Sequence, residues 1–475
     1  MNDDNNNNGD YGADTIPTNI PKVENKMGVM PIGKLLFQMS LPPIISMLIQ
    51  AMYNIVDSIF VAKVSEAALT GVTLVFPVQM LMISLNSGIG VGLSSLISRR
   101  LGEKNQNDAN SAAAHGFFLA IMCWIAYALF GFFLTEPFMK LFTDDAEILR
   151  SAVIYCKFVT IGSIFMCISI CIERVLQATG NMMYPMVFNA AGGIINTVLA
   201  PIFIVGYLGA PALGVTGAGA VAVFGQGVAC IIALVLFLKK RHRVTVSFKK
   251  FKPIGRIIKD ILVVGAPSIV MMSVGSFLIG GLNAILIAHS AVAVAVLGVY
   301  FRIQSFVFMP VIGLNQGALP VMGYNYGARN KVRLMAAYKL ALKIALTIMI
   351  IGVAIFWIFS KELMLLFSAS DEMLEMGVIA LRRISLCLIP AAFTIVTVGM
   401  FQALAHGVFA MIISLIRQLV LLLPLAYILA NNFGVNATWY AYGIAEIAAV
   451  ILAALFLRKV MKTDIAQMPE VIPKR

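Results

Sequence analysis

The chain has 475 residues, of which 60% are hydrophobic and 12% charged, and its formal net charge at pH 7 is +13. This composition excludes an ordinary soluble domain and indicates an integral membrane protein. The positive charge lies in short loops between apolar segments, so membrane topology explains it and we expect no nucleic-acid partner.

Residues 1–30 are rich in Asn, Asp and Gly and predict a disordered cytoplasmic tail, not a signal peptide. The chain then becomes a succession of apolar segments, each at least about 18 residues long and able to cross a bilayer as a helix. We therefore predict an all-α membrane protein with twelve transmembrane helices at residues 35–64, 68–98, 110–134, 147–177, 184–207, 213–238, 257–287, 292–320, 334–359, 373–403, 409–430 and 436–458.

Lysine and arginine residues set the expected orientation of these helices. They gather in the loops after even-numbered segments, whereas the opposite loops are acidic or neutral. The positive-inside bias places the basic loops and both termini, including a tail at 461–475, in the cytoplasm. The basic positions are Arg99, Arg100, Lys104, the stretch 239–256, Arg329, Lys331, Arg333, Arg458, Lys459 and Lys462.

The second half of the chain repeats the first half at a fixed offset. Pro42 corresponds to Pro267, and 267 minus 42 is 225; the same shift carries Gly88, Gly92 and Gly102 onto Gly313, Gly317 and Gly327. We expect a bundle of six helices at 31–238, a basic cytoplasmic linker at 239–256 and a second bundle at 257–460. With an even number of helices in each half, a pseudo-twofold axis along the membrane normal should relate them, in a V shape around a central cleft.

The first apolar segment carries a carboxylate, Asp57, and an ionisable group within a membrane marks a functional site by default. Polar residues recur at spacings of three and four along this helix and predict one stripe facing a cavity. The repeat does not copy the acid, because the equivalent position is Leu282. We expect a hinge at Pro42 and Pro43. The stripe comprises Ser46, Gln50, Asn54 and Asp57.

Other polar positions in the apolar segments are less specific. Five basic residues could reach the interface or pair with main-chain carbonyls: Lys157, Arg302, Arg382, Arg383 and Arg417. Glu446 is a second-half acid that could replace Asp57 in ion coupling. The six cysteines all fall inside apolar segments and have no metal-ligand spacing, so we interpret them as packing residues.

Several motifs together resemble the multidrug and toxic compound extrusion (MATE) family of the multidrug/oligosaccharidyl-lipid/polysaccharide flippase superfamily. The resemblance covers residues 35 to about 460, nearly the whole chain. Its motifs include NIVDSIFVAKV from Asn54, LISRRLGEKN from Leu96, ERVLQATGNMMYPM from Glu173, NTVLAPIFI from Asn196 and FQALAHG from Phe401.

The resemblance implies roles for single residues. Asp57 matches the first-helix aspartate that couples transport to protons or sodium, and Tyr155 and Asn196 match its neighbours in the ion-coupling site. Glu173 matches a polar position that helical rise places nearer the cytoplasmic mouth, where it could act in gating with Arg174. Two departures, Ala200 in place of an Asp and Ala222 in place of a Thr, favour a proton over a sodium ion.

The resemblance also implies a function. We expect a monomeric antiporter of the bacterial or archaeal plasma membrane that exports amphipathic, often cationic, drugs by alternating access in exchange for H⁺, with Na⁺ left open. A flippase for a lipid-linked oligosaccharide or cell-wall precursor is the alternative, and it would show a basic cavity. No motif of a catalytic site appears, so we expect neither an enzyme nor a cofactor. The substrate cavity candidates are Gln50, Asn54, Glu173 and Glu446.

Overall fold

The computed structural model describes residues 25–62, 66–206, 213–239, 242–248, 251–367 and 370–469, except that the side chains of residues 51–62, 66, 67 and 69 lie outside the description. Within these ranges every regular element is helical, and the predicted all-α fold is confirmed. In chain order the elements are α1 (Lys26–Val29), α2 (Ile32–Ala62), α3 (Glu66–Gly102), α4 (Gln106–Leu129), η1 (Phe130–Leu134), α5 (Thr135–Met139), α6 (Ala146–Ile161), α7 (Ile164–Ala178), α8 (Met183–Val205), α9 (Gly214–Lys239), α10 (Gly255–Ile287), α11 (Ala291–Gly327), α12 (Lys331–Ile358), α13 (Ser360–Leu365), α14 (Asp371–Ser385), α15 (Leu388–Ala403), α16 (Gly407–Leu415), η3 (Ile416–Leu422), α17 (Leu423–Phe433), α18 (Val435–Thr438), α19 (Tyr440–Val460) and η4 (Met461–Ile465).

Twelve membrane spans arise from ten long apolar helical segments and two bent pairs of helices in the described ranges. The pairs α6–α7 and α14–α15 bend by 43° and 47°. They correspond to the predicted segments 147–177 and 373–403, at equivalent places in the two halves. Ser163 lies at the first bend, where its Oγ donates a hydrogen bond of 2.6 Å to the carbonyl of Thr160. This local bond offers the backbone an alternative to the regular helical pattern.

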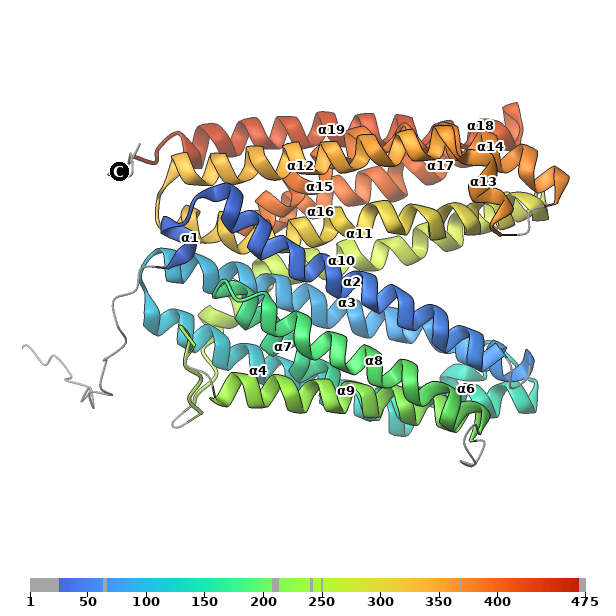
Figure 1. The fold of residues 1–475 in the computed structure, drawn as a ribbon, viewed down its shortest axis with the longest axis horizontal. Helices are drawn as coiled ribbons and strands as arrows, with labels where there is room; N and C mark the ends of the chain where they lie inside the picture. The colour runs from blue at the N-terminus through green and yellow to red at the C-terminus, as the bar shows by residue number, and fades with distance from the viewer. Residues whose placement is uncertain are drawn as a thin grey trace, which may run out of the picture.

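Two bundles lie next to each other with their helices roughly along the long axis (Figure 1). Helices α2 to α9 form most of one bundle, and α10 to α19 form most of the other. We call the end that carries α1 the α1 end. The bundles lie close together there and diverge toward the opposite end, which gives the predicted V shape (Figure 1).

The first helix of each half begins inside the core of the other bundle. Leu36, on α2, is fully buried in the hydrophobic core formed mainly by α11 to α19, and Figure 1 shows α2 crossing from that bundle to the other. Ile261, on α10, is fully buried in the core formed mainly by α3 to α9. The two positions are 225 residues apart (261 minus 36), so this exchange follows the internal repeat.

Glycines of the repeat lie where the two bundles meet. A Cβ on Gly88 of α3 would lie 2.7 Å from the amide nitrogen of Ile269 on α10. The equivalent Gly313 of α11 faces Ile44 of α2 in the same way, at 2.9 Å. Subtracting 225 from 269 gives 44, so the two contacts are reciprocal. Only glycine permits such close backbone contact, which explains why these positions match in the sequence.

A second reciprocal contact closes the α1 end. Gly102 faces the carbonyl oxygen of Tyr324, and Gly327 faces the carbonyl oxygen of Arg99, with each pair related by the offset of 225. The segment around α1 covers this region and is tied to the second bundle: Arg333 Nη2 donates hydrogen bonds of 3.2 and 2.7 Å to the carbonyls of Met27 and Met30.

A charged cluster joins α3, α4 and α10 at the same end. Arg100 lies within 2.8 Å of Glu103 and 3.3 Å of Asp260, and Asp108 lies 3.2 Å from Arg256. Most of these side chains are partly exposed, so the cluster fixes the relative position of the helices more than it adds stability. Separate hydrogen bonds hold residues of the predicted linker against the first bundle: Gln106 donates to the carbonyl of Arg243 at 2.6 Å, and the amide of Ile254 donates to His115 at 2.8 Å.

Candidate functional site

A cavity of about 260 Å³ lies between the two bundles. Its walls come from α3 and α7 of the first bundle and from α10, α11, α15, α16 and η3 of the second. This is the position that alternating access requires for a site that each side of the membrane reaches in turn. The lining residues are Val91, Ser94, Arg174, Gln177, Met271, Met272, Ile312, Asn315, Gln316, Leu319, Thr394, Ile395, Val398, Gln402, Ser414, Arg417 and Gln418.

Arg417 brings one positive charge to the cavity wall. It lies on the π-helical segment η3, between α16 and α17. Such segments occur often at functional sites because the extra residue re-aims the side chains that follow. The Nη1 atom donates hydrogen bonds of 3.4 and 3.1 Å to the two carboxylate oxygens of Glu446 on α19, which is buried behind it. Glu446 itself is not among the lining residues.

Arg174 brings a second positive charge from the opposite bundle. Its side chain is 9% exposed, and its Nη1 donates a hydrogen bond of 3.2 Å to Oε1 of Gln177, one turn later on α7. Gln177 in turn donates to Glu173 at 2.8 Å, and Asn189 of α8 donates to the other oxygen of Glu173 at 3.0 Å. Glu173 therefore lies behind the cavity wall, and Gln177 separates it from Arg174.

At this cavity wall, the two halves carry the larger side chain on different members of an equivalent pair of helices. Arg174 packs over Gly90, where an added Cβ would lie 2.6 Å from its Cγ. The equivalent of Arg174 is Gly399, and the equivalent of Gly90 is Asn315, whose side chain occupies the space over Gly399. The large side chain is thus on α7 in one half and on α11 in the other. Both point to the central cavity.

The floor of the cavity toward the α1 end is a polar contact between bundles. Ser95 Oγ of α3 donates a hydrogen bond of 2.6 Å to the carbonyl of Gln402. The Gln402 side chain donates to Ser268 Oγ of α10 at 2.9 Å. All three residues are buried. This contact separates the cavity from the α1 end.

The predicted ion-coupling residues lie within the first bundle. Tyr155 of α6 is buried, and its hydroxyl accepts a hydrogen bond of 3.4 Å from Gln79 of α3. Asn196 of α8 is also buried, and its Oδ1 atom has no hydrogen-bond partner among the described residues. Asp57 is on α2, but its side chain lies outside the described residues, so the three-residue cluster stays a prediction.

The other candidates on α2 are placed as follows. Gln50 is exposed and is not among the described residues that line the cavity between the bundles, and the side chain of Asn54 lies outside the described residues. Pro42 and Pro43 are buried within α2, which continues through them as one helix. A proline removes one helical hydrogen bond and weakens the helix locally. The hinge therefore stays a prediction.

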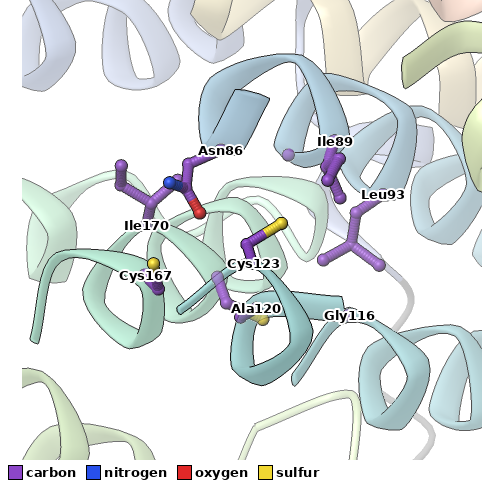
Figure 2. A pocket seen from close by; sticks show the side chains of 10 residues that line it. Asn86, Ile89, Leu93, Gly116, Ala120, Cys123, Cys167 and Ile170 are labelled. Carbon is purple, nitrogen blue, oxygen red and sulfur yellow. The ribbon is translucent and has the colours of Figure 1, made fainter. Parts of the chain in front are cut away.

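A second, much smaller pocket lies inside the first bundle. Its volume of about 10 Å³ is roughly the space of one water molecule. Cys123, Cys167 and Cys171 line it with Asn86, which donates a hydrogen bond of 3.1 Å to the hydroxyl of Tyr127. Figure 2 shows the side chains of Cys123, Cys167 and Asn86 around this pocket. All six cysteines are free thiols, and this pocket is too small to hold a transported molecule.

Comparison with protein families decides the identity. The MatE family model matches the chain twice, over residues 42–202 and 267–428. The chain belongs to the MATE family. The two matches begin 225 residues apart (267 minus 42), which is the offset of the repeat.

Similar proteins match over nearly their whole length. The multidrug export protein MepA of Staphylococcus aureus is 25% identical over 445 residues, which cover 93% of this chain and 97% of MepA. A multidrug resistance MATE transporter solved in an outward-facing conformation is 29% identical, with a TM-score of 0.86 and coverage of 92% and 98%. A transporter of the MOP superfamily from Pyrococcus furiosus, whose binding pocket is described as reversed in polarity, has 28% identity, a TM-score of 0.85 and coverage of 92% and 97%.

Sequence reasoning about this MATE protein named Arg174, as a gating partner of Glu173, and Arg417, but it placed neither in the wall of the cavity. Arg417 was interpreted as a residue that reaches the interface or pairs with a carbonyl; instead it pairs with Glu446. Arg383 does follow the simpler interpretation, because it donates a hydrogen bond of 2.6 Å to the carbonyl of Asn436. The sequence signal for the cavity is the group of polar residues within apolar helices, but the inward face is defined only by the packing of the bundles.

Proposed function

We propose that the protein is a cation-coupled antiporter that exports amphipathic small molecules through the cavity between its bundles. The observation that carries this proposal is a polar and apolar cavity enclosed by two repeat-related bundles and separated from the α1 end by the contact of Ser95 with Gln402. Membership in the MATE family and similarity to the multidrug export protein MepA support it. Alternating access then requires the bundles to separate at the α1 end and to close at the opposite end.

The α1 end faces the cytoplasm in this proposal. Basic residues gather there in loops and helix ends, among them Arg99, Arg100, Arg333 and Arg458. The positive-inside bias assigns such ends to the cytoplasm. The described arrangement then has its cytoplasmic side closed, and export begins when that side opens to take up substrate.

Protons are the proposed coupling ion, and Asp57 is the proposed site. Neutralising a carboxylate in the bilayer removes an attraction for cations and alters the packing of its helix. Pro42 and Pro43 weaken α2 locally, so this helix could bend as Asp57 changes charge. One charge moved across about 150 mV corresponds to roughly 3.5 kcal/mol, or a few hundredfold in concentration. One proton per substrate molecule is therefore sufficient for useful export.

Dye transport in proteoliposomes tests this coupling. Wild-type protein should accumulate an amphipathic dye when a pH gradient is imposed, and an equal sodium gradient at constant pH should give little accumulation. Asp57→Asn should reduce the pH-driven rate to roughly the rate without a gradient. Accumulation at the wild-type rate by Asp57→Asn, or a response to sodium alone, would contradict the proposed coupling. Glu446→Gln provides the parallel test of the second-half acid.

A flippase for a lipid-linked precursor is the second candidate function. The observation that favours it is the presence of Arg174 and Arg417 in the cavity wall, because such precursors carry a diphosphate. A dithionite-quenching assay with a fluorescent polyprenyl diphosphate lipid in the same proteoliposomes separates the candidates. A flippase would move the lipid across the bilayer, whereas a drug antiporter would move the dye and leave the lipid in place.

A further inference from the structure

The charge of the central cavity is the opposite of what a site for cationic molecules needs. Its described lining contains Arg174 and Arg417 and no Asp or Glu. Two acids lie close to this lining but outside it: Glu173, which accepts a hydrogen bond from Gln177, and Glu446, which pairs with Arg417. A charge inside a membrane protein is costly unless another group compensates for it, so each arginine needs a partner.

Arg174 lacks a partner for its charge among the described residues. No carboxylate lies within 4.0 Å of its guanidinium in the part of the chain that the structure describes, and its recorded hydrogen bond goes to the neutral amide of Gln177. A guanidinium has five N–H donors. The Nε atom is buried and has no hydrogen-bond partner among the described residues. Arg174, a residue that is only 9% exposed, thus brings to the cavity wall a positive charge that no described carboxylate balances.

Arg417 has its partner on one side only. Both recorded hydrogen bonds to Glu446 come from the same nitrogen, Nη1. The side chain remains 24% exposed, compared with 7% for that of Glu446. The acid therefore neutralises Arg417 from behind, while other donors of the guanidinium remain available on the cavity side. Across the described residues of the cavity wall, the net charge is positive.

The remaining lining is suited to a molecule with an apolar body. Met271, Met272, Ile312, Leu319 and Val398 provide apolar contacts, and methionine adapts to different shapes. Asn315 adds a buried Oδ1 without a described partner; rotating this amide by half a turn would present its NH₂ group instead. A volume of about 260 Å³ is slightly below the roughly 300–1,000 Å³ of sites for drug-sized ligands, so a small amphiphile or the head of a larger one fits.

We infer that Arg174 and Arg417 form a binding site for an anionic group, a carboxylate or a phosphate, on an amphipathic substrate. The inference rests on the proposed function, since it names the substrate class of the same cavity. An anion between the two arginines would supply the acceptor that Arg174 lacks and would compete with Glu446 for Arg417. The anion could belong to a soluble amphiphile or to the head group of a lipid.

Binding of three molecules with one apolar body tests the charge preference. The probes are 2-naphthoate, 2-naphthamide and 2-naphthylmethylammonium, measured by isothermal titration calorimetry on the full chain in phosphatidylcholine nanodiscs without any ion gradient. The naphthoate should bind at least about tenfold more tightly than the amide, the order expected for one charge-assisted hydrogen bond, and the ammonium should bind more weakly still. Equal or tighter binding of the amide or the ammonium would overturn the inference.

Variants assign the preference to the two arginines. Arg174→Gln should weaken naphthoate binding about tenfold and weaken amide binding less, so that the preference for the anion decreases. Arg417→Gln leaves Glu446 buried without a partner and could impair folding, so the double variant Arg417→Gln/Glu446→Gln is used, and it should also weaken naphthoate binding. Glu446→Gln alone should strengthen it because Arg417 is released. Naphthoate binding that is unchanged in Arg174→Gln and in the double variant would overturn the inference.

Arg383→Gln is the matched control. Arg383 is an arginine of the second bundle that contacts the carbonyl of Asn436 and lies over the ring of Tyr440, away from the cavity lining. Its substitution should leave naphthoate binding at the wild-type level. A loss equal to that of Arg174→Gln would show that net charge, not the cavity, determines binding, and would count against the site.

A second set of nanodiscs identifies the source of the anion. Adding phosphatidic acid to the phosphatidylcholine should compete with naphthoate if a lipid head group enters the cavity, and should leave naphthoate binding unchanged if the site takes a soluble amphiphile; both results support an anion site. The binding assay uses no gradient, so it can fail while pH-driven dye transport and its loss in Asp57→Asn remain. Conversely, naphthoate could bind as expected in a protein that shows no gradient-driven transport.

Discussion

The pair formed by Arg417 and Glu446 is a buried ionic contact within the membrane-spanning part of the protein. Glu446 is 6% exposed, and the nearest N–O distance is 3.1 Å. Breaking such a pair from one side leaves a buried charge alone, whereas replacing both partners with apolar residues removes the desolvation penalty together with the attraction. We therefore expect the pair to contribute more to the charge distribution at the cavity wall than to the stability of the folded protein.

Stability measurements on this pair test that expectation. Arg417→Met should destabilise the protein by about 3–5 kcal/mol because Glu446 remains buried without a partner. The double variant Arg417→Met/Glu446→Leu should recover most of that loss. Unfolding in detergent, followed by circular dichroism, measures both. A double variant as unstable as the single one would show that the ion pair itself stabilises the fold.

The partners of single side chains were the hardest feature of this structure to predict from the sequence. The sequence indicates Glu446 as a possible functional acid, and the structure places it against Arg417, a partner that periodicity could not identify because it comes from another helix. Arg174 is next to Glu173 in the sequence, yet its hydrogen bond goes to Gln177. Side-chain partners across helices depend on how the bundles pack, and a single sequence does not contain that information directly.

At the scale of helices, glycine contacts control how closely the bundles can approach. Gly102 and Gly327 each face a main-chain carbonyl of the other bundle at the α1 end. A side chain at either position would force the helices apart, since backbone atoms cannot move aside as a flexible side chain can. These glycines therefore permit the closed arrangement of this end.

Substitution of these glycines should shift the protein away from that arrangement. Gly102→Leu and Gly327→Leu should each reduce pH-driven dye transport by roughly tenfold, since separating packed helices costs about 1–3 kcal/mol. The control is Gly280→Ala on α10, where an added Cβ meets nothing within 4 Å. Transport at the wild-type rate by both leucine variants would contradict the role given to this contact.

The segment around α1 is a second element that holds the closed end. Met27 is fully buried against the second bundle, and Arg333 binds the carbonyls of Met27 and Met30. Burial, followed by the charge of Arg243, lowers the pKa of Lys26 on the same helix. The segment is thus packed between groups of both bundles.

Removal of the Arg333 contacts should loosen this segment. Arg333→Leu should increase hydrogen–deuterium exchange over residues 25–36 by roughly tenfold, corresponding to about 1–2 kcal/mol for the lost hydrogen bonds. Exchange in α17 and α18 at the opposite end should not change. Lys339→Leu, an exposed position on the same helix, is the control. Unchanged exchange over 25–36 would show that packing of Met27 alone holds the segment.

Helices were more predictable than their contacts. Apolar length placed all twelve spans, and the shared offset identified Gly88, Gly92 and Gly102 with their counterparts before any contact was known. The sequence did not show the bends within α6–α7 and α14–α15 or the π-helical segment η3, because these breaks interrupt apolar runs that look continuous. The sequence also did not show that α2 and α10 begin in the opposite bundle, because a hydrophobic pattern does not indicate which of two cores a helix packs into.

At the scale of the whole molecule, the contacts between the bundles follow the internal repeat, whereas the polar residues of the candidate site do not. The contacts between bundles at Gly88 and Gly313, and at Gly102 and Gly327, follow the pseudo-twofold axis. The polar residues of the site do not: Asp57 corresponds to Leu282, and Arg174 to Gly399. In the proposed mechanism, the symmetric contacts allow the bundles to rock, and the asymmetric side chains determine what they carry.

Reversible locking of the α1 end tests most directly whether the bundles must separate there. In the double variant Ser98→Cys/Gly323→Cys, the distance from the Ser98 Cβ to a Cβ built on Gly323 is 3.4 Å, close to the roughly 3.5–4.5 Å of disulfides. Oxidation should abolish pH-driven dye transport in proteoliposomes, and reduction should restore it, while each single-cysteine variant should be unaffected by oxidation. Transport by the oxidised, cross-linked double variant at the rate of the reduced protein would contradict alternating access through the central cavity.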